Sequence, residues 1–285
     1  MTVKEKAYAK VNLFLDVTAR RDDGFHDIRS VMHSVSLSDY LTISAEQAEE
    51  TTIILTTNID GLSVGEDNLI CRAARSYLTG FNINARVNIA LEKHIPIGAG
   101  LGGGSTDAAA TLRGLRRIFG LGTDRELLTI CESLGSDVPF CFVGGTAICT
   151  GRGERMEKCK SPDYHFVIAI GEERISTPKA YAALDKKYLN FTPDGYTPRD
   201  DVSALYNIFE SVTDIDDVRN IKEIMTKSGA EAVLMSGSGP SVFGIFETRS
   251  TAAASALPPP RPASLGIRFR IRISRPLGSF FMASQ

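Results

Sequence analysis

The sequence predicts an α+β protein of two domains, and three observations support this prediction. Segments with the two-residue period of a strand and segments with the period of a helix are mixed without a regular βα alternation. A glycine-rich loop, residues 96–106, lies between a strand pattern and a helix pattern. The polar stretch 154–163 interrupts the hydrophobic pattern near Arg155, in a chain of 285 residues that is long enough for two cores. We therefore expect an N-terminal domain, residues 1–155, and a C-terminal domain, residues 156–285.

Three strands are predicted near the start of the chain. Apolar and polar residues alternate over 11–17 and over 31–37, and a further strand pattern covers 53–57. Side chains two residues apart on a strand point the same way. Lys10 and Asn12 are therefore expected to share the face opposite the apolar residues of the first strand.

Helices dominate the rest of the first domain. A helix capped by Asn68 and ended by Gly80 is predicted over 68–80, and a half-buried strand over 83–91 leads into the glycine loop. Apolar residues at helical spacing follow over 108–119, and a capping box at 123–126 opens another helix. A short strand near Ala147 completes the domain.

The second domain is predicted to mix short strands with helices. The predicted elements are a strand over 166–170, a helix that opens with the cap and first-turn pair Thr177 and Pro178, helices over 202–210 and 217–227, and strands over 232–235 and 242–246. A second glycine-bearing turn, residues 236–240, joins the last two strands.

The glycine loop predicts a phosphate-binding site. Five glycines occur between Gly98 and Gly104, and the loop opens a helix, where free N–H groups and the positive end of the helix dipole favour an anion. At Gly103, a Cβ is expected to clash with phosphate or to require an unfavourable φ. A Walker A loop is excluded because glycine, not lysine, precedes Ser105. A dinucleotide fold is excluded because a second helix follows the first, and a flexible linker does not fit between two strongly periodic elements.

Composition and charge are those of a cytoplasmic protein. Hydrophobic residues make up 43% of the chain and the net charge is −2. No apolar run is long enough to cross a bilayer, and the N-terminus lacks the apolar core of a signal peptide. Five cysteines without a C-x-x-C pair, and four histidines without ligand spacing, argue against a disulfide framework and a structural metal site. We expect no membrane partner.

Three motifs in order resemble one known superfamily. They are Ala-Lys-Val-Asn-Leu-Phe-Leu at 9–15, the glycine loop at 96–106, and Met-Ser-Gly-Ser-Gly-Pro-Ser at 235–241. Together they resemble the galactokinase, homoserine kinase, mevalonate kinase and phosphomevalonate kinase superfamily. The resemblance implies a two-domain small-molecule kinase with its active site in the cleft between the domains.

Two further segments resemble one branch of that superfamily, whose members phosphorylate a cytidyl-linked methylerythritol in the non-mevalonate isoprenoid pathway. They are Arg-Asp-Asp-Gly-Phe-His at 21–26 and Gly-Ser-Asp-Val-Pro-Phe at 135–140. The resemblance extends over residues 5–247. It implies transfer of the γ-phosphoryl of ATP to the 2-hydroxyl of the methylerythritol moiety. The alternative within the superfamily is a homoserine or mevalonate type of kinase, which needs no cytidine site.

The resemblance also assigns roles to individual residues. Asp137 matches the general base and Lys10 the catalytic lysine, whose ammonium keeps the carboxylate ionised and stabilises developing charge. The implied ATP-binding residues are Pro96, Ile97, Gly98, Ala99, Gly100, Leu101, Gly102, Gly103, Gly104, Ser105 and Thr106. The hydroxyls of Ser105 and Thr106 are candidates to contact phosphate or Mg²⁺, with helix capping as their alternative role. No metal ligands are assigned.

The cytidine end is implied to involve aromatic residues. Phe25 and Tyr181 are expected to stack on the pyrimidine, His26 to read its polar edge, and Asn12 to hydrogen-bond the substrate. The alternatives are that Phe25 is a core aromatic at a turn and that Tyr181 packs beside Leu184 on an apolar helix face.

The C-terminal tail, residues 248–285, departs from the superfamily, which continues with an amphipathic helix and a closing strand. A short helix-compatible run at 252–256 is broken by three prolines at 258–260. Beyond it, Arg268, Arg270 and Arg272 alternate with apolar residues. This pattern predicts a strand with a basic face, while the abrupt change in composition equally fits a changed reading frame or a divergent, disordered terminus.

The arginines of the tail offer a reading from a different class, an RNA-binding protein. Six arginines and no acidic residue or lysine follow Glu247, so the rest of the chain is acidic. An acidic body argues against nucleic acid as the main partner. We expect ATP and the cytidyl substrate as ligands, no nucleic acid, and a monomer or a homodimer.

Overall fold

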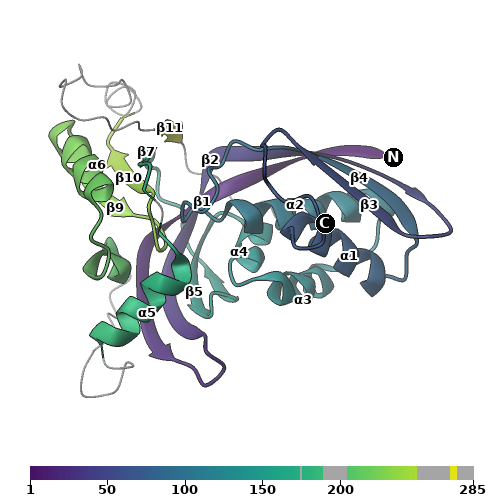
Figure 1. Ribbon diagram of the computed structural model, residues 1–285, viewed down its shortest axis with the longest axis horizontal. Helices are drawn as coiled ribbons and strands as arrows, with labels where there is room; N and C mark the ends of the chain where they lie inside the picture. Colours follow the sequence, from purple (N-terminus) through teal and green to yellow (C-terminus); the bar gives the residue numbers. More distant parts are fainter. Residues whose placement is uncertain (174, 189–203, 249–269, 275–285) are drawn as a thin grey trace.

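Two β-sheets with helices packed on them make up the computed structural model (Figure 1). It describes residues 1–173, 175–188 and 204–248, together with the backbone of 270–274. The first sheet comprises β1 (Thr2–Arg20), β2 (His26–Gln47), β3 (Thr52–Thr57), β4 (Ala85–Glu92), β5 (Thr146–Gly151), β6 (Arg155–Lys158) and β8 (Tyr206–Asn207). The second comprises β7 (His165–Ile170), β9 (Ala232–Met235), β10 (Val242–Phe246) and β11 (Arg270–Ser274). The predicted α+β class is confirmed.

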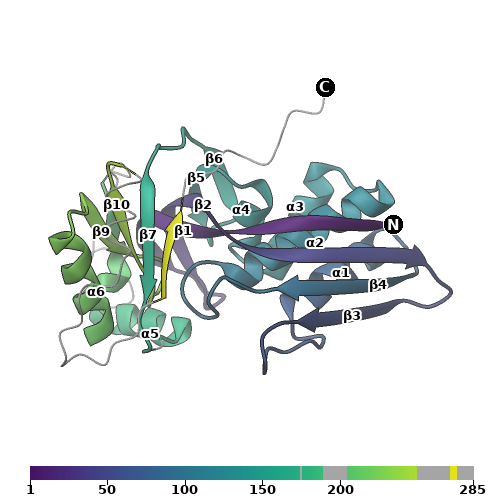
Figure 2. The same cartoon turned by 90° about the horizontal axis from the view of Figure 1, so that it is seen from above.

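The strand order places the N-terminal hairpin at the centre of the first sheet. The order is β3-β4-β2-β1-β8, and β5 pairs with β2 and with β6. In the second sheet the order is β11-β7-β10-β9. Four helices cover one face of the first sheet: α1 (Leu69–Gly80), α2 (Gly103–Phe119), α3 (Asp124–Leu134) and α4 (Val138–Val143) (Figures 1 and 2). The second sheet is accompanied by α5 (Thr177–Lys187), the 3₁₀ helix η2 (Ile208–Ser211) and α6 (Asp216–Lys227).

The helix boundaries follow the predicted capping chemistry. The side chain of Asn68 accepts a hydrogen bond from the N–H of Ile70 at the start of α1. Thr123 and Glu126 form the reciprocal capping box of α3. Gly120 ends α2 in the left-handed conformation, where a residue with a Cβ would be strained.

The long hairpin of β1 and β2 links the two parts of the molecule. Its register begins at Thr2 opposite Ser44 and ends at Arg20 opposite His26, with irregularities on either side of Lys10 and Asn12. Bulges of this kind bend a strand and redirect its side chains. One core lies between the first sheet and its helices and continues between the second sheet and α5, η2 and α6. A second core, with Phe14 and Phe166 among its members, lies where the hairpin meets the second sheet.

The helix predicted over 202–210 is wrong for the residues that the structure describes. Tyr206 and Asn207 form β8, parallel to Phe14 and Leu15 of β1, and η2 follows. The side chain of Asn207 explains the break: its Oδ1 accepts from the N–H of Phe209, and its Nδ2 donates to two carbonyl oxygens of the second glycine turn region. Residues 202 and 203 lie outside the described residues.

Two smaller differences concern the second domain. α5 is capped one residue earlier than predicted, at Ser176, so that Thr177 and Pro178 occupy its first turn. β11 pairs antiparallel with β7, which confirms a strand at Arg270–Ser274 (Figure 2). Arg268 and the remainder of the expected atypical tail lie outside the described residues.

Candidate active site

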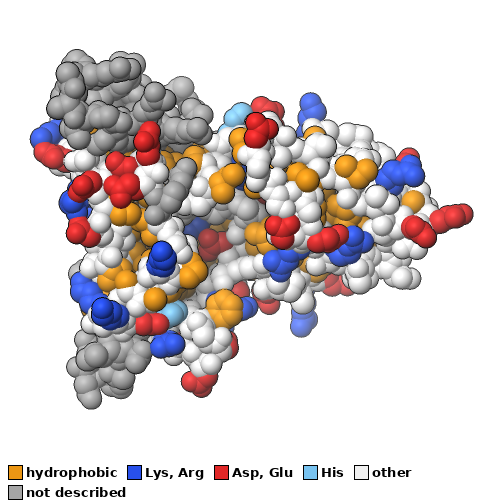
Figure 3. Space-filling model, viewed as in Figure 1, with side chains coloured by type: hydrophobic (Ala, Val, Ile, Leu, Met, Phe, Trp, Pro, Cys, Tyr) orange, Lys and Arg blue, Asp and Glu red, His pale blue; other side chains and the backbone are white. Residues whose placement is uncertain are grey.

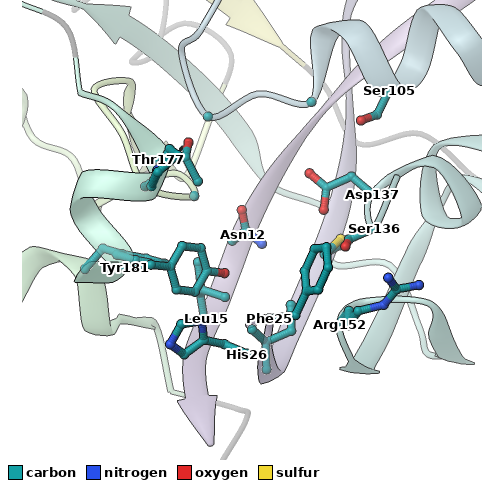
Figure 4. A pocket seen from close by; sticks show the side chains of 18 of the residues that line it. Asn12, Leu15, Phe25, His26, Ser105, Ser136, Asp137, Arg152, Thr177 and Tyr181 are labelled. Atoms are coloured by element: carbon teal, nitrogen blue, oxygen red, sulfur yellow. Dashed lines mark hydrogen bonds between the residues drawn. The ribbon is translucent and has the colours of Figure 1, made fainter. Parts of the chain in front are cut away.

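A cavity of about 620 Å³ lies between the two parts of the molecule. The space-filling view shows this face hollowed between the lobe of α5 and α6 and the lobe of α1 to α4 (Figure 3). The hairpin, the glycine loop, the start of α4, α5 and the turn at 236–240 all contribute to its lining. Six of the sequence-predicted residues outside the glycine loop line it, namely Lys10, Asn12, Phe25, His26, Asp137 and Tyr181 (Figure 4).

Lys10 and Asp137 form an ion pair in the wall of this cavity. Lys10 Nζ lies 3.3 Å from Asp137 Oδ2, and the lysine side chain is 5% exposed while that of the aspartate is 29% exposed. Lys10 Nζ also donates to Asn12 Oδ1 at 2.8 Å, which confirms that the two side chains share a face. Asn12 in turn donates to Ser30 Oγ at 2.8 Å. This chain of hydrogen bonds fixes the ammonium beside the carboxylate.

The backbone around Asp137 leaves its carboxylate directed into the cavity. Asp137 stands at the N-cap of α4, but its side chain makes no capping hydrogen bond. A carboxylate that does not cap a helix is available to a ligand. The arrangement can therefore accept a proton from a bound hydroxyl while an ammonium lies within ion-pair distance.

The glycine loop meets the second glycine turn at the edge of the cavity. Gly100 has a φ of +75°, and a Cβ there would collide with the carbonyl oxygen of Ser236. Ser236 Oγ donates to the carbonyl oxygen of Gly100 at 3.0 Å, and Ser241 Oγ donates to that of Ala99 at 2.5 Å. At Gly102, with a φ of +68°, a Cβ would lie 3.0 Å from Cγ of Lys10. Side chains at these glycines would push apart the two turns and the lysine.

The loop residues do not all face the cavity. Gly100, Gly102 and Ser105 line it, whereas the side chains of Ala99 and Leu101 are buried in the core. The hydroxyl of Thr106 is buried and donates its proton to the carbonyl oxygen of Tyr8 at 2.8 Å, so that proton is not available to a phosphate oxygen.

Of the two reasons predicted for glycine at position 103, the unfavourable φ is wrong. Gly103 begins α2 and does not have a positive φ, and its missing Cβ would lie 3.0 Å from Lys93 Nζ and 3.1 Å from Cγ2 of Ile95. The position packs over a buried lysine, which by itself requires a small residue there; the clash of a Cβ with phosphate stays a prediction.

That lysine belongs to a buried ion triad which the sequence analysis missed. Lys93 Nζ lies 2.5 Å from Asp39 Oδ2 and 2.6 Å from Asp107 Oδ2. Burial lowers the pKa of Lys93, but the attraction of the two carboxylates outweighs it and the pKa is raised overall. Asp39 Oδ1 also accepts from the N–H groups of His94 and Ile95, where the chain enters the glycine loop. No local motif signals the triad, because its carboxylates come from distant segments.

The other end of the cavity holds the aromatic residues. His26 Nε2 lies 2.7 Å from Asp185 Oδ1, a partner that the sequence analysis missed. The His26 ring stacks on Tyr181 with centroids 4.6 Å apart, and Tyr181 packs edge-to-face on Phe209 at 4.9 Å. Burial raises the pKa of Tyr181 above its ordinary value. Tyr181 therefore packs against protein as well as lining the cavity.

Phe25 is half exposed, so it is not a core aromatic. Its ring lines the cavity, and the guanidinium of Arg152 lies 5.1 Å from the ring centroid. The cavity thus has a loop suited to phosphate at one end, an aromatic cluster at the other, and a carboxylate–ammonium pair between them (Figure 4).

Fold and site together define a small-molecule kinase of the GHMP class. The model of the N-terminal domain of GHMP kinases matches residues 68–145, and that of the C-terminal domain matches residues 214–258. A solved homoserine kinase from Cytophaga hutchinsonii shares the fold, with a TM-score of 0.68 at 17% identity over 97% of this chain and 95% of that one. ATP is the co-substrate that this class implies.

Relatives of higher sequence identity show to which family of GHMP kinases the chain belongs. The chain is 42% identical to the 4-diphosphocytidyl-2-C-methyl-D-erythritol kinase of Caldicellulosiruptor saccharolyticus, over 88% of this chain and 90% of the relative. It is 44% identical to that of Exiguobacterium sibiricum, over 88% and 92%. A solved 4-(cytidine 5'-diphospho)-2C-methyl-D-erythritol kinase has a TM-score of 0.79 at 30% identity and covers 97% of this chain and 100% of its own. The chain belongs to the 4-diphosphocytidyl-2-C-methyl-D-erythritol kinase family.

Proposed function

We propose that this chain transfers the γ-phosphoryl of ATP to the 2-hydroxyl of 4-diphosphocytidyl-2-C-methyl-D-erythritol, in the non-mevalonate route to isoprenoid precursors. Family membership supports the reaction class. The observation that carries the assignment of the site is the pair of Lys10 and Asp137, 3.3 Å apart between the glycine loop and the aromatic cluster.

Asp137 acts as the general base in this proposal. Its carboxylate accepts the proton of the acceptor hydroxyl as that oxygen bonds to phosphorus and the bond from phosphorus to the ADP oxygen breaks. The adjacent ammonium of Lys10 stabilises the negative charge that develops during transfer. Asn12 holds that ammonium in place through its 2.8 Å hydrogen bond.

The glycine loop, residues 96–106, holds the phosphates of ATP. Its backbone N–H groups and the N-terminus of the 17-residue α2 provide partial positive charge. Ser105 supplies a hydroxyl at the same end of the cavity. Binding both substrates in one cavity supplies most of the remaining rate enhancement by positioning.

Mg²⁺ fits this donor set as a companion of ATP. Among the described residues no three His, Cys, Asp or Glu side chains are grouped to hold a metal ion. Magnesium in kinases is bound through one or two carboxylates, substrate phosphates and water, and it neutralises phosphate charge. Ser105, whose hydroxyl lines the cavity beside the glycine loop, is the side chain that would hold it together with the phosphates of ATP.

The cytidine end consists of Phe25, His26 and Tyr181. Phe25 offers an exposed ring face for the pyrimidine, and His26 is fixed by Asp185 and by its stack on Tyr181. A homoserine or mevalonate kinase has no need of such a cluster. We therefore propose the cytidyl acceptor over the other acceptors of the class.

We further propose that the protein acts in the cytoplasm as a monomer or homodimer, without a nucleic-acid partner, and with its domains divided near Arg155. Within the described ranges, no helix combines the length and the apolar character needed to span a membrane. Light scattering of the purified chain, with and without RNA, measures the oligomeric state and any complex.

An acceptor panel tests the proposed function. ADP formation is measured with the cytidyl methylerythritol, homoserine and mevalonate as acceptors, and the phosphorylated carbon is located by ³¹P–¹³C coupling. We expect turnover with the cytidyl compound alone and phosphate on the 2-hydroxyl. Turnover of homoserine or mevalonate at an equal or higher kcat/KM would overturn the assignment.

A further inference from the structure

Arg152 is a cavity residue to which the mechanism above gives no role. It lies in the turn between β5 and β6, where its backbone N–H donates to Glu154 Oε2 at 2.7 Å. Its side chain is half-buried and lines the cavity (Figure 4). The neighbouring glycines 151 and 153 both have positive φ, with values of +69° and +122°. Arg152 therefore lies in a tight turn at the edge of the cavity, and the hydrogen bond to Glu154 holds this turn in place.

The guanidinium covers one side of the Phe25 ring. It lies 5.1 Å from the ring centroid, within the range of a cation–π contact. The backbone N–H of Phe25 donates to Asp23 Oδ1 at 3.1 Å, and its carbonyl oxygen accepts from the N–H of Arg21 at 2.8 Å. Figure 4 shows the ring between Arg152 and Tyr181, so the ring face away from the guanidinium looks across the cavity.

Of the charged side chains that line the cavity in the described part of the chain, Arg152 is the one without an ion-pair partner. Lys10 is paired with Asp137, and His26 with Asp185. Arg152, by contrast, makes no ion pair or side-chain hydrogen bond within the part of the chain that the structure describes, and its guanidinium contacts the Phe25 ring. The hydrogen bond from the Phe25 N–H, the Arg21 guanidinium and, to a smaller extent, the charge of Arg152 lower the pKa of the exposed Asp23 carboxyl. A half-buried guanidinium retains its charge at any physiological pH, and its planar fork matches the oxygens of a phosphate.

We propose that Arg152 determines acceptor specificity by binding the diphosphate of the acceptor while it holds Phe25 against the pyrimidine. This inference rests on the proposed function and names a residue that recognises the charged part of that substrate. The position favours the acceptor over ATP, because Arg152 lies beside Phe25 and Ser136, whereas Ser105 and the glycine loop lie at the opposite end (Figure 4).

Cytidine and CDP differ only in the diphosphate, so comparing their affinities separates binding of the diphosphate from stacking on the pyrimidine. Calorimetry on the full chain gives the affinities for cytidine and for CDP, and their ratio measures what the diphosphate adds. We expect Arg152→Met to reduce the preference for CDP over cytidine by about 10- to 100-fold, as for loss of a charged hydrogen-bonding partner. Phe25→Leu should weaken both ligands and leave the ratio unchanged. Arg152→Lys keeps the charge without the fork and should retain part of the preference.

Arg155→Met is the matched control, because its side chain is 78% exposed and lies three residues along the same turn region. In kinetics, Arg152→Met should raise KM for the acceptor with little change in kcat or in KM for ATP. An equal loss of cytidine and CDP binding by Arg152→Met would overturn the diphosphate role, and so would a selective loss of affinity for a non-hydrolysable ATP analogue. If the unaltered chain bound neither cytidine nor CDP, the proposed function itself would fail.

Discussion

His33 is expected to make the stability of the protein depend on pH. The imidazole is fully buried on β2, its Nδ1 lies 2.7 Å from Thr146 Oγ1, and its ring packs on Phe166 of β7 with centroids 5.3 Å apart. It therefore lies where the two sheets meet. Nε2 is buried and has no hydrogen-bond partner within the described residues. Burial lowers the pKa of His33 from 6.5 to about 4.

The size of the effect follows from the two pKa values. The unfolded chain takes up a proton on this histidine below about pH 6.5, whereas the folded chain does so only near pH 4. Between these values the unfolded state binds more protons, so the stabilising contribution is lost as the pH falls. Between pH 7 and pH 5 the free energy of unfolding should fall by about 2 kcal/mol through His33 alone.

Urea denaturation at pH 7 and pH 5 measures this contribution by comparison with a variant. His33→Asn removes the titrating group, while its amide can still meet Thr146. We expect the fall in unfolding free energy between the two pH values to be about 2 kcal/mol smaller for this variant than for the unaltered chain. His94→Asn, at an exposed position, serves as the control. If His33→Asn and the unaltered chain lost the same stability, His33 would not be buried as a neutral ring and the reasoning would be refuted.

Three further predictions concern the loop, the triad and the aromatic cluster. Gly100→Ala should abolish ATP binding measured by calorimetry. Gly61→Ala should retain ATP binding, because Gly61 has a similar φ of +78° but nothing lies within 4 Å of its Cβ. Equal affinities of the two variants for ATP would argue against a tight contact between the two glycine turns. Lys93→Met leaves two buried carboxylates without their cation and should lower the free energy of unfolding by roughly 3–5 kcal/mol in urea titrations; a loss below 1 kcal/mol would mean that water reaches the triad. His26→Ala and Tyr181→Ala should weaken cytidine binding far more than ATP binding, since stacking on an aromatic is worth roughly 1–3 kcal/mol per base; equal losses would indicate general destabilisation.

Local sequence signals predicted the elements whose boundaries are set locally. The cap at Asn68 and the capping box at Thr123 define helix starts through hydrogen bonds within three residues, and both are present. The alternation of a strand is also a local signal, and it correctly predicted that the side chains of Lys10 and Asn12 lie on the same face of β1. β8 was missed because its conformation is set by pairing with β1, where Tyr206 lies opposite Phe14, a residue 192 positions earlier in the sequence.

The same distinction between local signals and tertiary contacts applies to the residues of the candidate site. The motif residues could be recognised because each lies in a contiguous stretch of sequence. Asp185 and the Asp39 carboxylate could not, since each acts on a group that only the tertiary structure brings near. Gly103 shows the remaining difficulty: a glycine can be required by a buried lysine beneath it as readily as by a ligand above it.

Asp137 and Lys10 act as one catalytic unit in the proposed mechanism. Asp137→Asn keeps the shape of the side chain and removes the proton acceptor, and Lys10→Ala removes the ammonium that lies 3.3 Å from it. Groups that act together lose activity non-additively, so the double variant should be little slower than the slower single variant.

The most direct measurement is the single-turnover rate of phosphoryl transfer to the cytidyl methylerythritol by Asp137→Asn, with ATP and acceptor both saturating. We expect the rate to fall by roughly 10²- to 10⁴-fold, as for loss of a general base, while calorimetry shows both substrates bound with affinities close to those of the unaltered chain. A rate for Asp137→Asn within a few-fold of the unaltered chain would contradict the account, because positioning alone would then drive the transfer.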